Sequence, residues 1–252
     1  MKTQPLVCAR GIVNRFGEQV IHDGVDLDIL PGEILGVAGG SGSGKSVLLR
    51  TLTGLHRPNA GEVLVDGRPI GSIHDAVRAS LIGVLFQQGA LFSSLSVAQN
   101  IMLPIRLHTD VSDEEREKIA AMKLELAGLS PESGLKFPSE LSGGMVKRAA
   151  FARALALDPR VLFLDEPTSG LDPLLAGGID DLILKLNEGL GVTFVIVTHD
   201  LGSIYVATDR VILLDRKAKG IIASGDPRKL RDESTDPRVR AFFNRESQAV
   251  VT

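Results

Sequence analysis

The segment from Gly39 to Ser46 constrains the fold more than any other part of the chain. Its residues, Gly-Gly-Ser-Gly-Ser-Gly-Lys-Ser, match the pattern G-x-x-x-x-G-K-[ST]. The segment follows an apolar run from Ile34 to Ala38 and precedes a helical pattern from Lys45 to Thr53, which Gly54 ends as a C-cap. This strand, loop and helix order predicts a phosphate-binding loop. A Gly/Ser stretch without a strand before it and a helix after it is more often a flexible linker.

The chemistry of phosphate binding explains the residue types of this loop. Glycines allow backbone N–H groups to turn towards phosphate oxygens, and the helix that follows directs the positive end of its dipole at them. We expect Lys45 to reach the β and γ phosphates and Ser46 to ligate Mg²⁺. The residues expected to contact the phosphates are Gly39, Gly40, Ser41, Gly42, Ser43, Gly44, Lys45 and Ser46.

A second motif ends the apolar segment from Val161 to Leu164. It delivers two adjacent carboxylates, Asp165 and Glu166, to the end of a predicted strand. We expect Asp165 to hold the Mg²⁺ shell and Glu166 to polarise the water that attacks the γ-phosphate. Two acids after a strand are by themselves more often a solvated turn, and the phosphate-binding loop is what favours the catalytic interpretation.

Hydrophobic periodicity predicts an α/β fold. Strands are expected up to about Val65, including the alternating segment from Val25 to Ile29, and then at 82–86, 161–164 and 193–197. The period is helical from Gln88 to Leu157, where Ser112 and Glu115 have the spacing of a capping box. The helix between the last two strands has one apolar face, made of Leu175, Ile179, Leu182, Ile183 and Leu186. The alternation of strands and helices predicts a parallel sheet. Two glycines inside that last helix, Gly177 and Gly178, have no explanation in the sequence.

Composition excludes several classes of protein. The chain has 252 residues, with 28 Lys and Arg against 31 Asp and Glu, and its formal charge of −3 argues against a nucleic-acid coat protein. Cys8 is the only cysteine, which excludes an intramolecular disulfide and favours a cytoplasmic setting. No segment approaches the roughly 18 apolar residues of a membrane-spanning helix, and residues 1–10 lack the apolar core of a signal peptide. If the protein functions at a membrane, another protein would have to anchor it there.

The segment Leu141-Ser142-Gly143-Gly144-Met145 makes the resemblance to a family specific. It opens a helix that runs through Lys147, Arg148 and Arg153 shortly before Asp165. Here the chain resembles an ABC-type ATPase cassette, whose pattern is Leu-Ser-Gly-Gly-Gln. Met145 replaces the glutamine and removes an amide that hydrogen-bonds nucleotide. Ser142 and the N–H groups of Gly143 and Gly144 remain able to bind a γ-phosphate from a helix N-terminus.

The resemblance extends to four further positions, in the family's order. Phe16, 29 residues before Lys45, matches the aromatic that stacks on adenine, although it also fits a core position. Gln87 matches the family's Mg²⁺ and γ-phosphate sensor, with Gln88 the less favoured neighbour. Asp172 lies in the dimer-contact loop and also suits a helix start. His199 matches the switch histidine, a role that a lone histidine would not suggest.

The resemblance implies a P-loop NTPase fold: a RecA-like parallel-sheet core, an antiparallel β subdomain and a helical subdomain. We expect an ABC ATPase domain over 1–230 with its helical subdomain at about 88–158, and a tail over 231–252. It also implies that ATP and Mg²⁺ bind, with ATP contacted by Phe16, the phosphate loop, Ser142 to Met145 and Asp172. The metal would be held by Ser46, Gln87 and Asp165, and catalysis would involve Lys45, Gln87, Glu166 and His199. ATP would lie between the phosphate loop of one copy and Ser142 to Gly144 of a second.

Met145 and the tail segment from Asp236 to Phe243 resemble the ATPases of Mla and Mce-type phospholipid transport systems. The implied partners are a second ATPase copy, a permease dimer, an Mce-domain lipid-binding protein and a small STAS-domain protein, with no nucleic acid. The implied location is the cytoplasmic side of the bacterial inner membrane. The tail is expected either to clasp the neighbouring ATPase or to pack its Phe pair on its own subunit. The alternatives are an importer ATPase for an amino acid, metal or other small solute, a soluble ABC ATPase, and a non-hydrolysing module.

Overall fold

The computed structural model describes residues 4–244, and the chain divides into two compact units. The first unit consists of Met1–Ser72 and Val195–Thr252, and the second consists of Ile73–Phe194. The division passes through one strand, β8 (Thr193–Val197).

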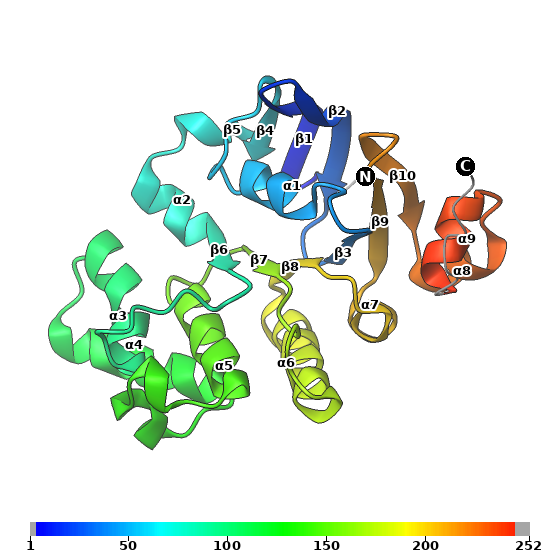
Figure 1. Ribbon diagram of the computed structural model, residues 1–252. Helices are drawn as coiled ribbons and strands as arrows, with labels where there is room; N and C mark the ends of the chain where they lie inside the picture. The colour runs from blue at the N-terminus through cyan, green and yellow to red at the C-terminus, as the bar shows by residue number, and fades with distance from the viewer. Residues whose placement is uncertain (1–3, 245–252) are drawn as a thin grey trace. The chain divides into compact units, whose positions relative to one another are not determined.

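A four-stranded sheet in the first unit has the order β2-β1-β4-β5 (Figure 1). Its strands are β1 (Val7–Phe16), β2 (Gln19–Ile29), β4 (Ala60–Val65) and β5 (Arg68–Pro69). β1 pairs antiparallel with both β2 and β4. In β2 the apolar residues Val25, Leu27 and Ile29 are buried and the intervening Asp26 and Asp28 are exposed, which confirms the predicted alternation.

The larger sheet has the strand order β10-β9-β3-β8-β7-β6. Besides β8, its strands are β3 (Ile34–Gly39), β6 (Ile82–Leu85), β7 (Val161–Asp165), β9 (Arg210–Asp215) and β10 (Gly220–Gly225). β3 pairs parallel with β9, and β6 pairs parallel with β7. Every residue of β3, β7 and β8 is buried, as expected for parallel strands that are covered on both faces. The edge strand β10 departs from the predicted parallel arrangement, because it pairs antiparallel with β9.

The first unit contains four α-helices in its described part and one short 3₁₀ turn, Ile70–Ser72. The helices are α1 (Lys45–Leu52), α7 (Leu201–Ala207), α8 (Pro227–Glu233) and α9 (Pro237–Phe243). Among residues 4–244 no helix combines the length and the apolar character needed to cross a membrane.

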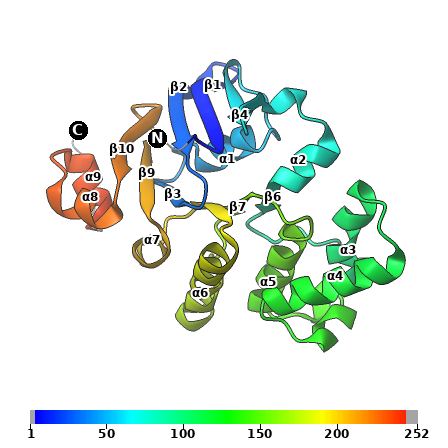
Figure 2. The same cartoon turned by 180° about the vertical axis from the view of Figure 1, so that it is seen from behind.

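Helices α8 and α9 lie near the end of the described residues, where the sequence analysis expects a tail. Each follows an Asp-Pro pair, and the side chains of Asp226 and Asp236 accept hydrogen bonds from the first-turn N–H groups. In both views the two helices lie together beyond β10 (Figures 1 and 2). Phe243 is 2% exposed and packs on Phe242 and Tyr205, whose hydroxyl donates to the Phe243 carbonyl at 3.1 Å. The Phe pair therefore packs on its own subunit. The remaining tail residues, 245–252, lie outside the described residues, so the dimer clasp stays a prediction.

The second unit contains the predicted helical block. Its helices are α2 (Asp75–Leu81), α3 (Val97–His108), α4 (Asp113–Leu126), α5 (Gly143–Ala154) and α6 (Pro173–Leu190), with 3₁₀ turns at Pro131–Leu135 and Pro138–Glu140. The predicted capping box at Ser112 and Glu115 is confirmed, and α3 begins with a second one at Ser96 and Gln99. Apolar side chains of α3, α4 and α5 form one buried cluster that holds this block together.

Helix α6 departs from its predicted apolar face at one position. Ile179, Leu182, Ile183 and Leu186 are buried, but Leu175 is 40% exposed. Leu175 lies in the first turn of α6, and its side chain is near Gly144: a Cβ on that glycine would stand 3.2 Å from Leu175 Cδ1.

The structure explains one of the two glycines inside α6. Arg148 Nη2 donates to the Gly178 carbonyl at 3.1 Å, and a Cβ at Gly178 would lie 2.9 Å from the same nitrogen. Any side chain at this position would displace the guanidinium. Nothing in the structure explains Gly177, whose Cβ would meet no atom within 4 Å.

Candidate functional site

The phosphate loop lies between β3 and the start of α1, as the motif predicts. Gly39, Gly42 and Gly44 have φ values of 150°, 73° and 96°, which are backbone conformations that favour glycine. Lys45 is the first residue of α1, and its Nζ donates to the carbonyls of Gly39 at 2.8 Å and Gly40 at 3.2 Å. The Lys45 ammonium is thus held against the first two residues of the phosphate loop. The helix begins without an acidic side chain in its first turn, which leaves its dipole available to an anion.

Three buried polar side chains form a hydrogen-bonded group, and one of them contacts the phosphate loop. Asn14 Nδ2 donates to His22 Nδ1 and to Thr51 Oγ1, both at 3.0 Å, and all three residues are fully buried. The imidazole touches the loop itself, because a Cβ on Gly44 would stand 2.5 Å from His22 Nε2. Burial lowers the pKa of His22 from 6.5 to about 4. The imidazole is therefore neutral at physiological pH, which suits its role as acceptor from Asn14.

His22 should make the stability of the protein depend on pH. Its pKa is depressed in the folded state, so the unfolded chain binds a proton first, and stability that is complete above about pH 6.5 is lost as the pH falls towards 4. Between about pH 7.5 and 5 the expected loss from this group is about 2 kcal/mol of the free energy of unfolding. Guanidinium denaturation at both pH values measures it. His22→Leu should flatten the dependence by that amount, and an unchanged dependence would show that His22 does not carry it.

The two other predicted nucleotide residues of the first unit are Phe16 and His199. Phe16 ends β1 and is 50% exposed, which excludes the core interpretation. Its ring stacks on His56 with a centroid distance of 5.1 Å. His199 is exposed and follows β8, whose end is joined to β3 by a hydrogen bond from Thr198 N to Val37 O. Within the first unit, His199 and the phosphate loop thus follow neighbouring strands.

A second group of predicted site residues, which includes two carboxylates, lies in the second unit. Parallel pairing of β6 with β7 places Leu85 opposite Leu164, so Gln87 and the pair Asp165 and Glu166 come at the same end of adjacent strands. Asp165 is 8% exposed. Glu166 has a φ of 51°, an uncommon conformation for a residue with a side chain. Gln87 and its neighbour Gln88 are both exposed.

The structure places one further residue, Lys147, against the predicted site residues Gln87 and Glu166. Its side chain is nearly buried, and its Nζ donates to the carbonyl of Gln87 and, at 3.1 Å, to that of Glu166. Burial lowers the pKa of Lys147, and the charges of Glu166 and Asp165 oppose that shift. The basic residues of this helix were visible in the sequence, but nothing local indicated which carbonyls they bind.

The segment Ser142 to Met145 forms the start of α5. Ser142 is the N-cap, and its Oγ accepts from the Met145 N–H at 3.4 Å. The N–H groups of Gly143 and Gly144 lie in the first turn, where an anion binds a helix. The Met145 side chain packs against the apolar cluster of α3, α4 and α5, which accounts for an apolar residue in this position.

Asp172 confirms the predicted helix start. Its carboxylate accepts from the N–H groups of Leu174 and Leu175, both at 3.0 Å, and Pro173 is the first residue of α6. Its role in a dimer contact remains a prediction.

Comparisons with known proteins agree with this geometry. A family model described as "ABC transporter" matches residues 22–169. The chain is 40% identical over 253 residues to the intermembrane phospholipid transport system ATP-binding protein MlaF of Haemophilus influenzae, over 98% of this chain and 94% of MlaF. It is 42% identical over 226 residues to the methionine import ATP-binding protein MetN of Brucella abortus, over 88% of this chain and 60% of MetN. The dimeric post-hydrolysis structure of the ATP-binding cassette MJ0796 with ADP and Pi matches with a TM-score of 0.79 and 33% identity, over 87% of this chain and 98% of that one.

The chain therefore belongs to the ATP-binding proteins of ABC transporters, and its fold is the α/β cassette of that family. It is an ATPase that resembles the ATP-binding subunit of Mla-type phospholipid transport systems.

Proposed function

We propose that this protein energises phospholipid transport across the bacterial envelope, from the cytoplasmic face of the inner membrane. The observation that carries the proposal is the similarity to MlaF, which extends over 98% of the chain, against 88% for MetN. Met145 and the segment from Asp236 to Phe243 favour the same subfamily. The second candidate is an importer ATPase for a small solute such as an amino acid, which the similarity to MetN supports.

The proposed roles of the residues follow from their chemistry. The phosphate loop and Lys45 bind the β and γ phosphates, Phe16 stacks on adenine, and His199 senses the γ-phosphate. Glu166 acts as the general base towards the attacking water. Ser46, Gln87 and Asp165 offer hydroxyl, amide and carboxylate oxygens, the ligand type that Mg²⁺ prefers. When bound, Mg²⁺ supplies charge that stabilises the phosphates during transfer.

The working state in this proposal is a homodimer, which the dimeric structure of MJ0796 supports. The N–H groups of Gly143 and Gly144 at the start of α5 face the nucleotide of the second copy, and Asp172 lies at the dimer contact. Closure of the two copies would bind ATP and hydrolysis would reopen them, so the chemistry acts as a conformational switch.

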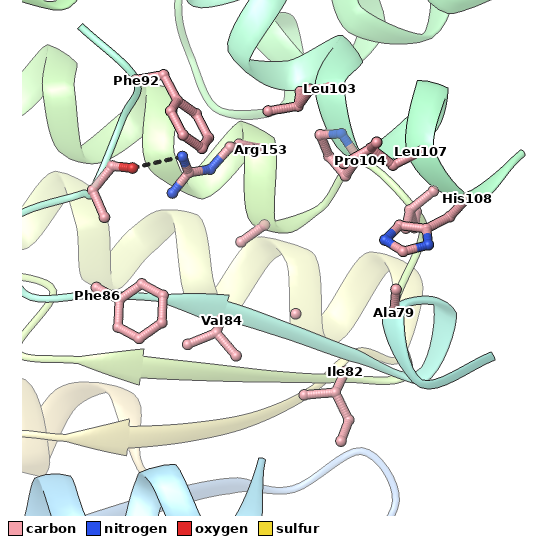
Figure 3. A pocket seen from close by; sticks show the side chains of 14 residues that line it. Ala79, Ile82, Val84, Phe86, Phe92, Leu103, Pro104, Leu107, His108 and Arg153 are labelled. Atoms are coloured by element: carbon pink, nitrogen blue, oxygen red, sulfur yellow. Dashed lines mark hydrogen bonds between the residues drawn. The ribbon is translucent and has the colours of Figure 1, made fainter. Parts of the chain in front are cut away.

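An apolar depression of the second unit offers a place for the permease. It has a volume of about 410 Å³ and lies between β6 and α3, with Val84, Phe86, Phe92, Leu103 and Leu107 on its walls (Figure 3). Phe92 and Leu107 are 53% and 66% exposed. Phe86 directly precedes Gln87, so an occupant would touch the residue next to the proposed sensor. We propose that a cytoplasmic segment of the permease, apolar on one side, inserts here.

Affinity purification of the tagged full-length chain from native membranes in mild detergent tests the cargo. Mass spectrometry of the same sample should find a permease, an Mce-domain protein, a small STAS-domain protein and bound phospholipid. A different permease with a soluble binding protein, and no phospholipid, would support the importer instead.

Leu107→Asp should reduce recovery of the permease about tenfold or more, since it places a charge in an apolar contact. Leu135→Asp is the matched control, because Leu135 is 82% exposed and lies outside the depression.

A further inference from the structure

Basic side chains of α5 bind backbone carbonyls in four separate parts of the second unit. Lys147 binds the carbonyls of Gln87 and Glu166. Arg148 binds Ala127 at the end of α4 and Gly178 in α6. Arg153 binds the carbonyls of Gly89 and Ala90, at 2.9 Å and 2.7 Å. Helix α5 thus fixes the loop after β6 at two places and the end of β7 at one.

The contact with Glu166 acts on a strained residue. A left-handed backbone conformation costs a non-glycine residue about 1–2 kcal/mol, so it persists only when its surroundings hold it. The Glu166 carbonyl accepts from Lys147 Nζ at 3.1 Å and from the Ser169 N–H at 3.2 Å. The second donor belongs to the same turn as Glu166. Lys147 is the donor that comes from another element, and it links the direction of the Glu166 backbone to the position of α5.

Lys147 is 7% exposed, so little water is available to replace a lost hydrogen bond of its ammonium. A nearly buried ammonium must keep its hydrogen bonds, because losing an acceptor leaves a charge without compensation. Both of its acceptors belong to residues with proposed roles in hydrolysis. The same helix begins at Ser142 to Gly144, the segment expected to bind the nucleotide of the second copy. A displacement of α5 would therefore reach Gln87 and Glu166 through one side chain.

We propose that Lys147 is a positioning residue for ATP hydrolysis. It holds the backbones of Glu166 and Gln87 in fixed positions and couples both to the start of α5. The proposal rests on the proposed roles of Glu166 and Gln87. Lys147 touches neither ATP nor the reacting water in this scheme. Its removal should impair the chemical step and leave nucleotide binding nearly intact.

The test compares Lys147→Met, Lys147→Arg and the control Lys118→Ala in the purified full-length chain. Methionine keeps the length of the side chain without hydrogen-bond donors, and arginine restores donors. Lys118 is an exposed lysine of α4 in the same unit, 71% exposed and paired with Glu114. Steady-state ATPase assays should show kcat lowered about tenfold or more for Lys147→Met with KM within about twofold of the wild type. Lys147→Arg should recover most of kcat, and Lys118→Ala should resemble the wild type.

Three outcomes would overturn the proposal. In the first, Lys147→Met keeps kcat within about twofold of the wild type. In the second, the KM of Lys147→Met rises enough to account for the loss of kcat/KM, which indicates a role in nucleotide binding. In the third, the methionine and arginine variants lose kcat equally although both unfold at the wild-type temperature, which shows that hydrogen-bond donation from position 147 does not support hydrolysis. Glu166→Gln is measured alongside: if it hydrolyses ATP normally, the proposed catalytic role of Glu166 is wrong and the Lys147 proposal fails with it, whereas an inactive Glu166→Gln beside an active Lys147→Met removes the Lys147 proposal alone.

Discussion

The variant Glu166→Gln is expected to bind ATP about as well as the wild type and to hydrolyse it about 10²–10⁴-fold more slowly. The amide has the shape of the carboxylate but cannot accept a proton from the attacking water. The backbone conformation at position 166, with φ of 51°, does not depend on the charge, and the carbonyl bonded by Lys147 remains. The chemical step should therefore be lost without loss of structure. Single-turnover hydrolysis and equilibrium binding of ATP by the purified chain measure the two effects separately.

Glu188→Gln is the control for this prediction. Glu188 is an exposed carboxylate near the end of α6 in the same unit, and its conversion to the amide changes the net charge equally. It should leave kcat unchanged. A Glu166→Gln variant whose kcat stays close to that of Glu188→Gln would contradict the assignment of the general base and would revive the interpretation as a non-hydrolysing module.

The parts of the structure that the sequence predicts well are those set by local patterns. The phosphate loop is a contiguous motif between a strand and a helix, and its glycines adopt the left-handed backbone that the motif implies at Gly42 and Gly44. Ser112 with Glu115, and Asp172 with Pro173, are capping patterns only a few residues long, and both begin helices as predicted. The alternation in β2 is equally local.

The parts that the sequence does not predict depend on contacts between distant residues. Nothing near position 147 indicates that its ammonium binds carbonyls at positions 87 and 166, which lie 60 and 19 residues away. The Asn14, His22 and Thr51 group likewise forms only when β1, β2 and α1 have packed. The helices α8 and α9 differ from these cases, because their signal was present: Asp-Pro pairs at 226–227 and 236–237 are typical helix starts.

The second large effect is expected at Gly44, where Ala should weaken both folding and ATP binding. Gly44 has φ of 96°, and an added Cβ would stand 2.5 Å from His22 Nε2 and 2.7 Å from Ile21 Cγ2. The loop must shift to relieve this contact, which displaces the N–H groups that bind phosphate. We expect Gly44→Ala to lower the free energy of unfolding by about 3 kcal/mol. The Kd for ATP should rise about 30-fold, the equivalent of about 2 kcal/mol. Chemical denaturation and equilibrium binding measure these effects, and Gly40→Ala, whose Cβ meets nothing within 4 Å, should keep its stability.

A second-site change separates the contact with His22 from the backbone cost at Gly44. His22→Ala removes the imidazole that the new Cβ would meet and leaves the positive φ of position 44 unchanged. In a double-mutant cycle, Gly44→Ala should therefore destabilise the His22→Ala background by about 1–2 kcal/mol less than the wild type. The remaining cost belongs to the left-handed backbone and to Ile21. An equal loss in both backgrounds would contradict the steric argument and assign the whole effect to the conformation of Gly44. A recovery of ATP affinity in the double variant would show that contact with the His22 imidazole sets the position of the phosphate-binding N–H groups.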